Sequence, residues 1–250
     1  MNLRSVDAGR GWQWIVDGFN LFKKSPLLWI SLTIVLALLW IVSFAIPVLG
    51  PLLFNLLSPV LFAGLMIGCR ALDNGEELEL AHLFAGFRQQ ASALVTIGGV
   101  YLVGTIVVLG AVFVVAGGSM LPTVLSKTTP DIETLTAAIR SMLLALTVGA
   151  AVYMPLLMLI WFAPLLVVFE GLAPMQAMKL SFAACWANVI PFLVYGLAIL
   201  VLWFIASIPL LLGLLVLLPV LFCSVYASYR DIFATAPGPA APAAGNPLPR

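Results

Sequence analysis

Residues 180–229 read LSFAACWANVIPFLVYGLAILVLWFIASIPLLLGLLVLLPVLFCSVYASY, a run of 50 residues without a charged side chain or a histidine. One membrane-spanning helix needs about 20 apolar residues, and a charged side chain at the bilayer centre costs roughly 2.5–3.5 kcal/mol on insertion scales. Pro209 lies in the middle of the run, where proline interrupts helical hydrogen bonding. The run therefore predicts two transmembrane helices joined by a tight turn.

Three further tracts of the chain, 25–69, 89–126 and 141–169, also lack charged side chains. The first is long enough for two crossings and contains a Pro47–Pro51 break, whereas the other two each hold one crossing. The sequence thus predicts an all-α, polytopic membrane bundle of six transmembrane helices in three hairpins. Their expected ranges are 27–46, 49–69, 94–116, 141–168, 189–208 and 210–229.

The composition agrees with a membrane protein. Apolar residues make up 63% of the chain and charged residues 8%, against about 25% charged residues in soluble domains. A net charge of +1 argues against nucleic acid as a partner. Residues 1–232 are expected to form one integral membrane domain, and the Pro- and Ala-rich residues 233–250 a disordered cytoplasmic tail. No secretory signal is expected in residues 1–24, which carry six charges.

Lysine and arginine fall mainly on one predicted side of the membrane. Six crossings place both termini on that side, together with the connections 70–93 and 170–188. Nine of the eleven basic residues would lie there, and only Lys127 and Arg140 on the other. Since basic residues concentrate on the cytoplasmic side, the sequence predicts a multi-pass protein of a bacterial inner membrane with both termini cytoplasmic.

Three segments share a pattern around an aromatic residue, which is Phe19, Phe87 or Phe182. Apolar residues stand four and seven positions before each, and a glycine or serine stands one position before: Gly18, Gly86 and Ser181. These spacings mark one face of a helix. Each segment precedes a predicted hairpin, so the sequence predicts three amphipathic helices that lie in the cytoplasmic headgroup region.

The second helices of the outer hairpins repeat a motif. Pro59-Val60-Leu61-Phe62 recurs as Pro219-Val220-Leu221-Phe222, and an arginine follows each proline by eleven residues, at Arg70 and Arg230. The fourth helix has a looser version that starts at Pro164. The chain is therefore interpreted as three repeated units of one interfacial helix and one hairpin.

Residues suited to catalysis or metal binding are scarce. The single histidine, His82, has no second ligand at helical spacing, and Cys69, Cys185 and Cys223 form no CxxC pair. No nucleotide-binding, nucleophile-elbow or zinc-protease motif occurs. The sequence predicts a non-enzymatic protein without a cofactor. The acidic run that opens with Asp73 is interpreted as stabilising the start of the second interfacial helix, rather than as a docking or cation site.

Basic and aromatic residues at the predicted membrane boundary are the candidate interfacial anchors. Arg70 and Arg230 are expected to reach lipid headgroups or helix-end carbonyl groups. The complete set is Trp12, Lys23, Lys24, Arg70, Arg88 and Arg230. Membrane lipid is the expected partner, with a second copy or another membrane protein left open.

Asn55, with Ser58 nearby, is the candidate polar site inside the membrane. Prolines lie near the middle of each second helix, as in transporters with broken helices, but no ionisable residue lies deep in a predicted crossing. Two functions remain open: a lipid-interacting or partner-organising membrane protein, which is favoured, and a small-solute transporter or channel that uses the proline-kinked helices.

The connection 117–140 is the one sizeable segment predicted on the outer side. Gly117-Gly118 is expected to end the third transmembrane helix. A helix is expected to start near Pro130 and to run into the fourth crossing, because Leu135, Ile139 and Met142 recur at helical spacing.

Three motifs carry a resemblance to a known group of proteins. They are the segment Gly11 to Pro26, which begins GWQW, the segment AHLFAGF at 81–87, and the closing Tyr226-x-x-Tyr229-Arg230-Asp231-Ile232. Over roughly residues 1–232 the chain resembles an uncharacterised family of proteobacterial six-helix inner-membrane proteins. The resemblance implies the topology and the location, and it carries no activity or site residues.

Overall fold

The computed structural model describes residues 3–125 and 131–233, and all regular elements within them are helices. In chain order they are α1 (Arg10–Lys24), α2 (Pro26–Ser43), α3 (Leu49–Asp73), the 3-10 helix η1 (Leu80–Phe84), α4 (Ala85–Arg88), α5 (Ala91–Leu125), α6 (Ile132–Ile160), α7 (Ala163–Glu170), α8 (Pro174–Ala187), α9 (Val189–Ser207) and α10 (Leu214–Phe233). The tail predicted for 233–250 lies, from residue 234 onward, outside the described residues.

Six stretches are long and apolar enough to cross a membrane. They are Pro26–Ser43, Leu49–Asp73, Ala91–Ala116, Leu135–Glu170, Val189–Ser207 and Leu214–Phe233. Each corresponds to one of the ranges expected from the charge-free tracts. The prediction of an all-helical protein with six candidate transmembrane helices is therefore confirmed.

The region between the third and fourth crossings agrees with one prediction and contradicts another. Gly117-Gly118 does not end the third transmembrane helix as predicted: the apolar stretch that could cross a membrane ends at Ala116, but α5 itself continues to Leu125. A glycine ends a helix only where water or a left-handed turn can satisfy the freed carbonyl groups, and an apolar tract favours continued helical hydrogen bonding. The second prediction is confirmed, since α6 begins at Ile132 and runs on toward the fourth crossing.

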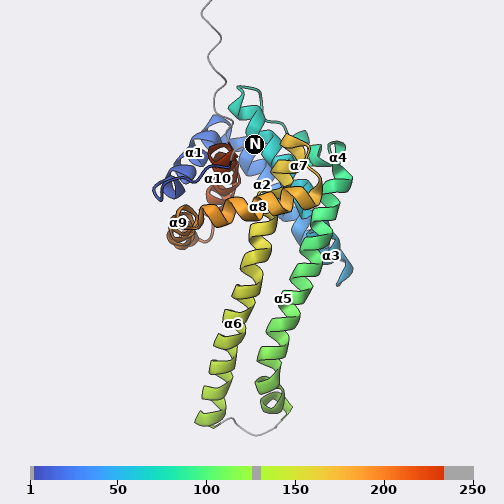
Figure 1. The fold of residues 1–250 in the computed structure, drawn as a ribbon, viewed down its shortest axis with the longest axis vertical. Helices are drawn as coiled ribbons and strands as arrows, with labels where there is room; N and C mark the ends of the chain where they lie inside the picture. Colours follow the sequence, from blue (N-terminus) through green and yellow to red (C-terminus); the bar gives the residue numbers. More distant parts are fainter. Residues whose placement is uncertain (1–2, 126–130, 234–250) are drawn as a thin grey trace, which may run out of the picture.

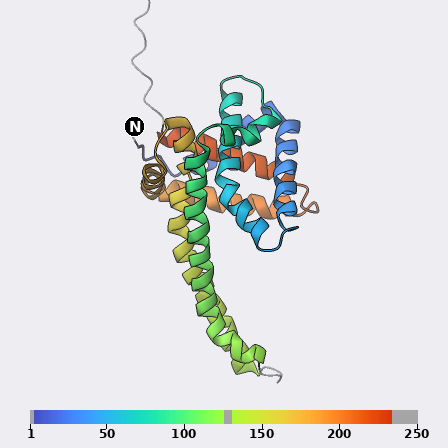
Figure 2. The same cartoon turned by 90° about the vertical axis from the view of Figure 1, so that its right-hand side faces the viewer.

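The six candidate transmembrane helices do not run as one compact parallel bundle. α5 and α6 lie side by side in both views and extend together well beyond the other helices (Figures 1 and 2). α9 is seen almost end-on in Figure 1, where α5 and α6 lie lengthwise, so the axis of α9 runs across the direction of the α5 and α6 axes. Large apolar side chains such as Val107, Phe113 and Val114 are exposed along α5, and the pair therefore needs apolar surroundings.

The fourth crossing is interrupted between α6 and α7, at Trp161 and Phe162. In an unbroken helix the Phe162 N–H would bond the Met158 carbonyl group. Instead, Phe162 N donates to the Ser181 hydroxyl at 2.9 Å, and that hydroxyl donates to the Met158 carbonyl oxygen at 2.7 Å. A side chain inserted into the hydrogen-bond ladder is a known cause of a helix break. Pro155 lies inside α6 without ending it.

The contacts between helices follow a cyclic order. The segment η1–α4 packs on α3, and α8 packs on α6 and α7, so each of these segments covers the second helix of the preceding unit. α1 has no preceding unit, and it packs on α10, the second helix of the last one. The three units thus close on one another, and the two ends of the described chain meet (Figure 1).

Equivalent residues of the repeat make equivalent contacts. A β-carbon added to Gly86 would lie 2.2 Å from the Val60 carbonyl oxygen, and one added to Gly18 would lie 2.7 Å from that of Val220. In the third unit the matching residue is Ser181, which bonds Met158. By this contact the counterpart of Val60 and Val220 is Met158, and the register that the sequence suggested from Pro164 is wrong.

The core lies where the second helices meet. The rings of Phe62 and Phe222, which are equivalent in the repeat, lie 6.4 Å apart between centroids. The Cys69 and Cys223 sulfur atoms, both buried, lie 3.8 Å apart. α3 and α10 are consequently the most buried of the candidate transmembrane helices, whereas α2, α5 and α9 expose most of their apolar side chains.

Candidate functional site

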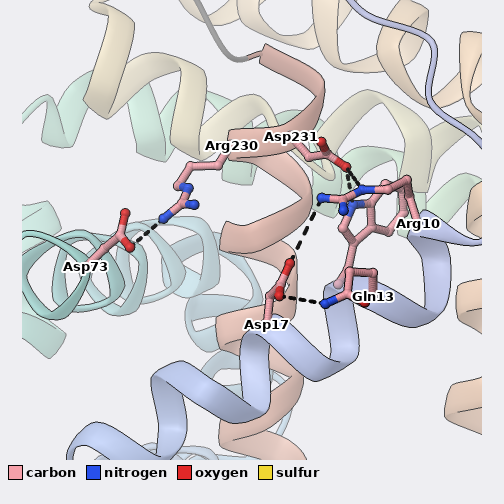
Figure 3. Close-up of polar contacts among 7 residues, drawn as sticks. Arg10, Gln13, Asp17, Asp73, Arg230 and Asp231 are labelled. Carbon is pink, nitrogen blue, oxygen red and sulfur yellow. Dashed lines mark hydrogen bonds and ion pairs between the residues drawn. The ribbon is translucent and has the colours of Figure 1, made fainter. Parts of the chain in front are cut away.

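A cluster of charged and polar side chains lies where α1 meets α10 and the end of α3 (Figure 3). We refer to it as the charged cluster. Its members are Arg10, Gln13, Trp14, Asp17, Asp73, Arg230 and Asp231.

Asp231 connects the last helix to the first. Its Oδ2 atom accepts a hydrogen bond from Arg10 Nε at 2.7 Å and another from the indole Nε1 of Trp14 at 2.9 Å. Trp14 is fully buried, and its ring packs against Phe192 and Tyr195 of α9. A buried indole N–H needs an acceptor, so the carboxylate of Asp231 fixes the ring as well as the arginine.

Asp73, the last residue of α3, connects α3 to α10. Arg230 forms an ion pair with Asp73 Oδ1, and the Tyr226 hydroxyl donates to Asp73 Oδ2 at 3.3 Å. The interpretation of Asp73 as part of the start of the next helix is wrong, because α3 extends to Asp73 and the following segment begins only at Leu80. Glu79 supplies that cap, through a capping box with His82.

A pocket of about 460 Å³ opens within the charged cluster. Its lining includes three cations, Arg10, Lys24 and Arg230, and three carboxylates, Asp17, Asp73 and Asp231. Most of these charges already face one another in pairs, and the Lys24 ammonium group donates to the Leu72 carbonyl oxygen at 2.8 Å. The arrangement is suited to holding α1, α3 and α10 together, and it presents no excess positive charge to an anionic ligand.

A smaller polar pocket of about 320 Å³ lies beside it, between α3, α7 and α10. The Arg70 guanidinium group stacks over the Phe169 ring, 4.9 Å from its centroid. The Tyr229 hydroxyl donates to Glu170 Oε1 at 2.8 Å. Arg70 and Arg230, which the repeat relates, therefore both have protein partners, a ring in one case and a carboxylate in the other.

An apolar groove of about 610 Å³ runs along the side of the molecule between α2, α3 and η1–α4. We name it the α4 groove. Phe84, Phe87 and Arg88 line one end of the groove, and Ile46 of the α2–α3 turn and Gly50 at the start of α3 line the other. Its remaining lining is Leu39, Val42, Ser43, Leu53, Phe54, Leu57 and Leu61.

A second apolar groove, of about 350 Å³, lies between α1, α9 and α10. We name it the α1 groove. Four positions of its lining stand 160 residues after positions that line the α4 groove. They are 202, 206, 213 and 217, which correspond to 42, 46, 53 and 57. Val16 and Phe19 of α1 likewise stand 68 residues before Phe84 and Phe87. The repeat has therefore built the same lateral groove twice.

The predicted interfacial anchors are distributed over these features. Trp12 lines the α1 groove, and the Lys23 ammonium group lies over the Phe19 ring, 5.1 Å from its centroid. Lys24 and Arg230 belong to the polar pocket of the charged cluster, and Arg70 to the pocket beside it, as described above. Arg88 stands alone at the end of the α4 groove.

The predicted polar site inside the membrane is less developed. The Ser58 hydroxyl donates to the Asn55 carbonyl oxygen within α3 at 2.8 Å. The Asn55 side-chain oxygen is buried and has no hydrogen-bond partner within residues 3–125 and 131–233. Neither residue lines any of the four pockets described above.

Among residues 3–125 and 131–233, no group of three His, Cys, Asp or Glu side chains is placed so that it could hold a metal ion. His82 acts locally, since its Nδ1 accepts a hydrogen bond from the Glu79 N–H at 2.9 Å. Burial raises the pKa of the Cys185 thiol to about 12. At neutral pH this thiol is protonated and a poor nucleophile.

Sequence reasoning missed Arg10, Trp14 and Asp231 as one unit. Their contacts join residues more than 200 positions apart, and no local spacing signals such a pair. The repeat is the sequence feature that could have indicated this contact. If each predicted interfacial helix packs on the preceding unit and the three units form a closed ring, the first interfacial helix packs on the last unit. That closure would have placed α1 against α10.

No family model matches this chain, and no solved structure matches it. A probable inner membrane protein of Burkholderia thailandensis is 30% identical over an alignment of 258 positions, and the alignment covers 93% of this chain and 94% of that protein. Together with the six apolar helices, this similarity confirms the proteobacterial relationship inferred from the motifs. The chain belongs to the family of inner-membrane proteins that includes this Burkholderia thailandensis protein.

Proposed function

We propose that the protein is a non-enzymatic membrane protein that binds lipid in the cytoplasmic leaflet through its two lateral grooves. The observation that carries the proposal is the duplication of the groove. The same repeat positions form an open apolar channel at the α4 groove and again at the α1 groove. The repeat thus offers acyl chains two equivalent apolar surfaces, one on each side of the molecule's core helices.

The side chains at the grooves support this role. Trp12, Phe19, Phe84 and Phe87 are each between 42% and 51% exposed, although they are large and apolar. Aromatic side chains of this kind gather at the boundary between headgroups and hydrocarbon. Lys23 and Arg88 stand beside them, as basic residues do where they meet anionic headgroups.

Lipid retained through purification in mild detergent tests the proposal. A variant with Trp12→Ser, Phe19→Ser, Phe84→Ser and Phe87→Ser makes both grooves polar at their headgroup ends. We expect it to retain less phospholipid per protein than the unaltered chain, because the apolar contact area at these sites is lost. Quantification of phosphorus against protein mass gives the result.

The control is a variant with Phe113→Ser and Val114→Ser, which removes exposed apolar area from α5 away from either groove. It should retain lipid like the unaltered chain. Equal retention by all three proteins, each monodisperse by size exclusion, would contradict lipid binding in the grooves.

A small-solute transporter or channel is the alternative function. The buried, unpartnered side-chain oxygen of Asn55 and the prolines inside α3, α6 and α10 favour it. Vesicles that contain the purified protein would then pass small polar solutes, and Asn55→Leu would abolish the flux. Solute passage no faster than in protein-free vesicles would remove this alternative.

A further inference from the structure

We infer that the α4 groove is a selective site for an anionic phospholipid, with one acyl chain along the groove and the phosphate at Arg88. The inference rests on the lipid-binding function proposed above and adds the headgroup class and the residue that recognises it. Three observations support it: the shape of the groove, the state of Arg88, and the contrast with the α1 groove.

The groove has the dimensions of a single acyl chain. It follows α3 from Gly50 to Leu61, which at 1.5 Å per residue is about 16 Å. Its lining is apolar along this length, with Ser43 as an exception on α2. Its volume of about 610 Å³ lies within the usual range for ligand sites.

Arg88 is the one cation that lines the groove, and it is available. It ends α4, its side chain is exposed, and within 3–125 and 131–233 it has no ion pair or side-chain hydrogen bond. Most other basic side chains around the charged cluster are engaged by carboxylates, a carbonyl group or a ring. A guanidinium group presents paired donors that match two phosphate oxygens.

The position of Arg88 fits a lipid that enters from one leaflet. Arg88, Phe84 and Phe87 stand together at one end of the groove, and the apolar turn between α2 and α3 closes the other. A phospholipid has the same order, with a charged phosphate followed by an apolar chain. A phospholipid always carries a negative phosphate at this end, whereas a helix of a partner protein need not carry an acidic residue there. The free Arg88 cation therefore favours a phospholipid as the occupant.

The α1 groove supplies an internal comparison. The residue equivalent to Arg88 in the first unit of the repeat is Asn20, 68 positions earlier. Asn20 does not line the α1 groove but the pocket of the charged cluster. The α1 groove therefore has the apolar channel without the equivalent cation. Lys23 lies over the Phe19 ring beside this groove but does not line it, so we expect the α1 groove to select anionic headgroups less strongly than the α4 groove does.

The inference is tested with the full-length protein, delipidated in detergent micelles. Phosphatidylglycerol or phosphatidylethanolamine is then added as the probe, and the binding of the two lipids is compared. Affinity for each is read from the lipid-dependent rise in the unfolding temperature. Arg88→Gln should lower the preference for phosphatidylglycerol about fivefold, the contribution of one basic side chain near an anionic surface. Arg88→Lys should retain most of it. Lys179→Gln, an exposed cation on α8 that lines neither groove, should leave it unchanged.

A groove-blocking variant separates this inference from the proposed function. Leu53 lines the α4 groove and is 44% exposed, so Leu53→Trp fills the channel without entering the core. It should weaken binding of both lipids at this site, whereas Leu200→Trp, exposed on α9 outside the grooves, should not. If Leu53→Trp weakens binding but Arg88→Gln leaves the preference unchanged, the headgroup inference fails alone. If neither variant alters binding of either lipid, the α4 groove holds no lipid, and the proposed function fails for this groove as well.

Discussion

The hydroxyl group of Ser181 takes the place of one backbone hydrogen bond in the fourth crossing. It accepts from Phe162 N and donates to the Met158 carbonyl oxygen, two groups that would bond each other in a continuous helix. Ser181 is fully buried, so neither group has access to water if the hydroxyl is removed. This single atom joins α8 to the break between α6 and α7.

Ser181→Ala is expected to lower the free energy of unfolding by about 1–3 kcal/mol, the cost of leaving buried polar groups unsatisfied. Ser207→Ala is the matched control, because the Ser207 hydroxyl bonds only the Trp203 carbonyl oxygen of its own helix. Unfolding curves in detergent or in bilayer discs measure both. A loss for Ser181→Ala no greater than that for Ser207→Ala would mean that the backbone closes into a continuous helix at no cost.

At this scale the sequence allowed only part of the site to be predicted. Ser181 was identified through its place before Phe182, but its bond to the backbone nineteen residues earlier has no local signature. Asp231 directly follows the predicted anchor Arg230, yet its partner Arg10 lies at the other end of the chain. Contacts of this kind depend on how the three units close, which local spacing does not specify.

Helices approach one another closely at two equivalent glycines, Gly18 and Gly86. A β-carbon on Gly18 would lie 2.6 Å from the Ser224 amide nitrogen, and one on Gly86 would lie 2.2 Å from the Val60 carbonyl oxygen. Both contacts are with backbone atoms, which cannot move aside as a flexible side chain could. Small residues at such crossings allow helices to pack closely in membranes.

Gly18→Ala and Gly86→Ala are each expected to lower the unfolding temperature, because the added methyl group separates α1 from α10 or α4 from α3. Gly196→Ala is the control, since Gly196 lies inside α9 and nothing surrounds it within 4 Å. This control should hold or raise the unfolding temperature, as alanine favours a helix over glycine by about 1 kcal/mol. Equal behaviour of the three variants would show that these crossings are not close-packed.

The six apolar stretches could be predicted from the sequence because the cost of burying charge in a bilayer acts on every residue of a crossing. How these helices pack against one another was harder to predict from the sequence. The sequence predicted a long fourth helix that projects a turn or two beyond the bilayer. It did not predict that α5 and α6 extend together beyond the other helices, because both stretches are as apolar as the buried α3. Hydropathy distinguishes membrane from water, but it does not distinguish a helix surrounded by lipid from one surrounded by protein.

At the scale of the whole molecule, lipid binding as proposed requires one orientation: α1, η1–α4, α8 and the headgroup ends of both grooves face the cytoplasm, and the tip of the α5–α6 pair faces the opposite side. The positions of lysine and arginine in the sequence support this orientation. The headgroup at Arg88 would otherwise belong to the outer leaflet.

Labelling of single introduced cysteines in spheroplasts with a membrane-impermeant maleimide tests this arrangement most directly. The native cysteines are buried, so they provide a silent background. Glu77→Cys and Lys179→Cys, both exposed beside the interfacial segments, should react only after the membrane is permeabilised. Glu133→Cys, exposed at the start of α6, should react in intact spheroplasts. Labelling at position 77 or 179 before permeabilisation, or protection at position 133, would contradict the account.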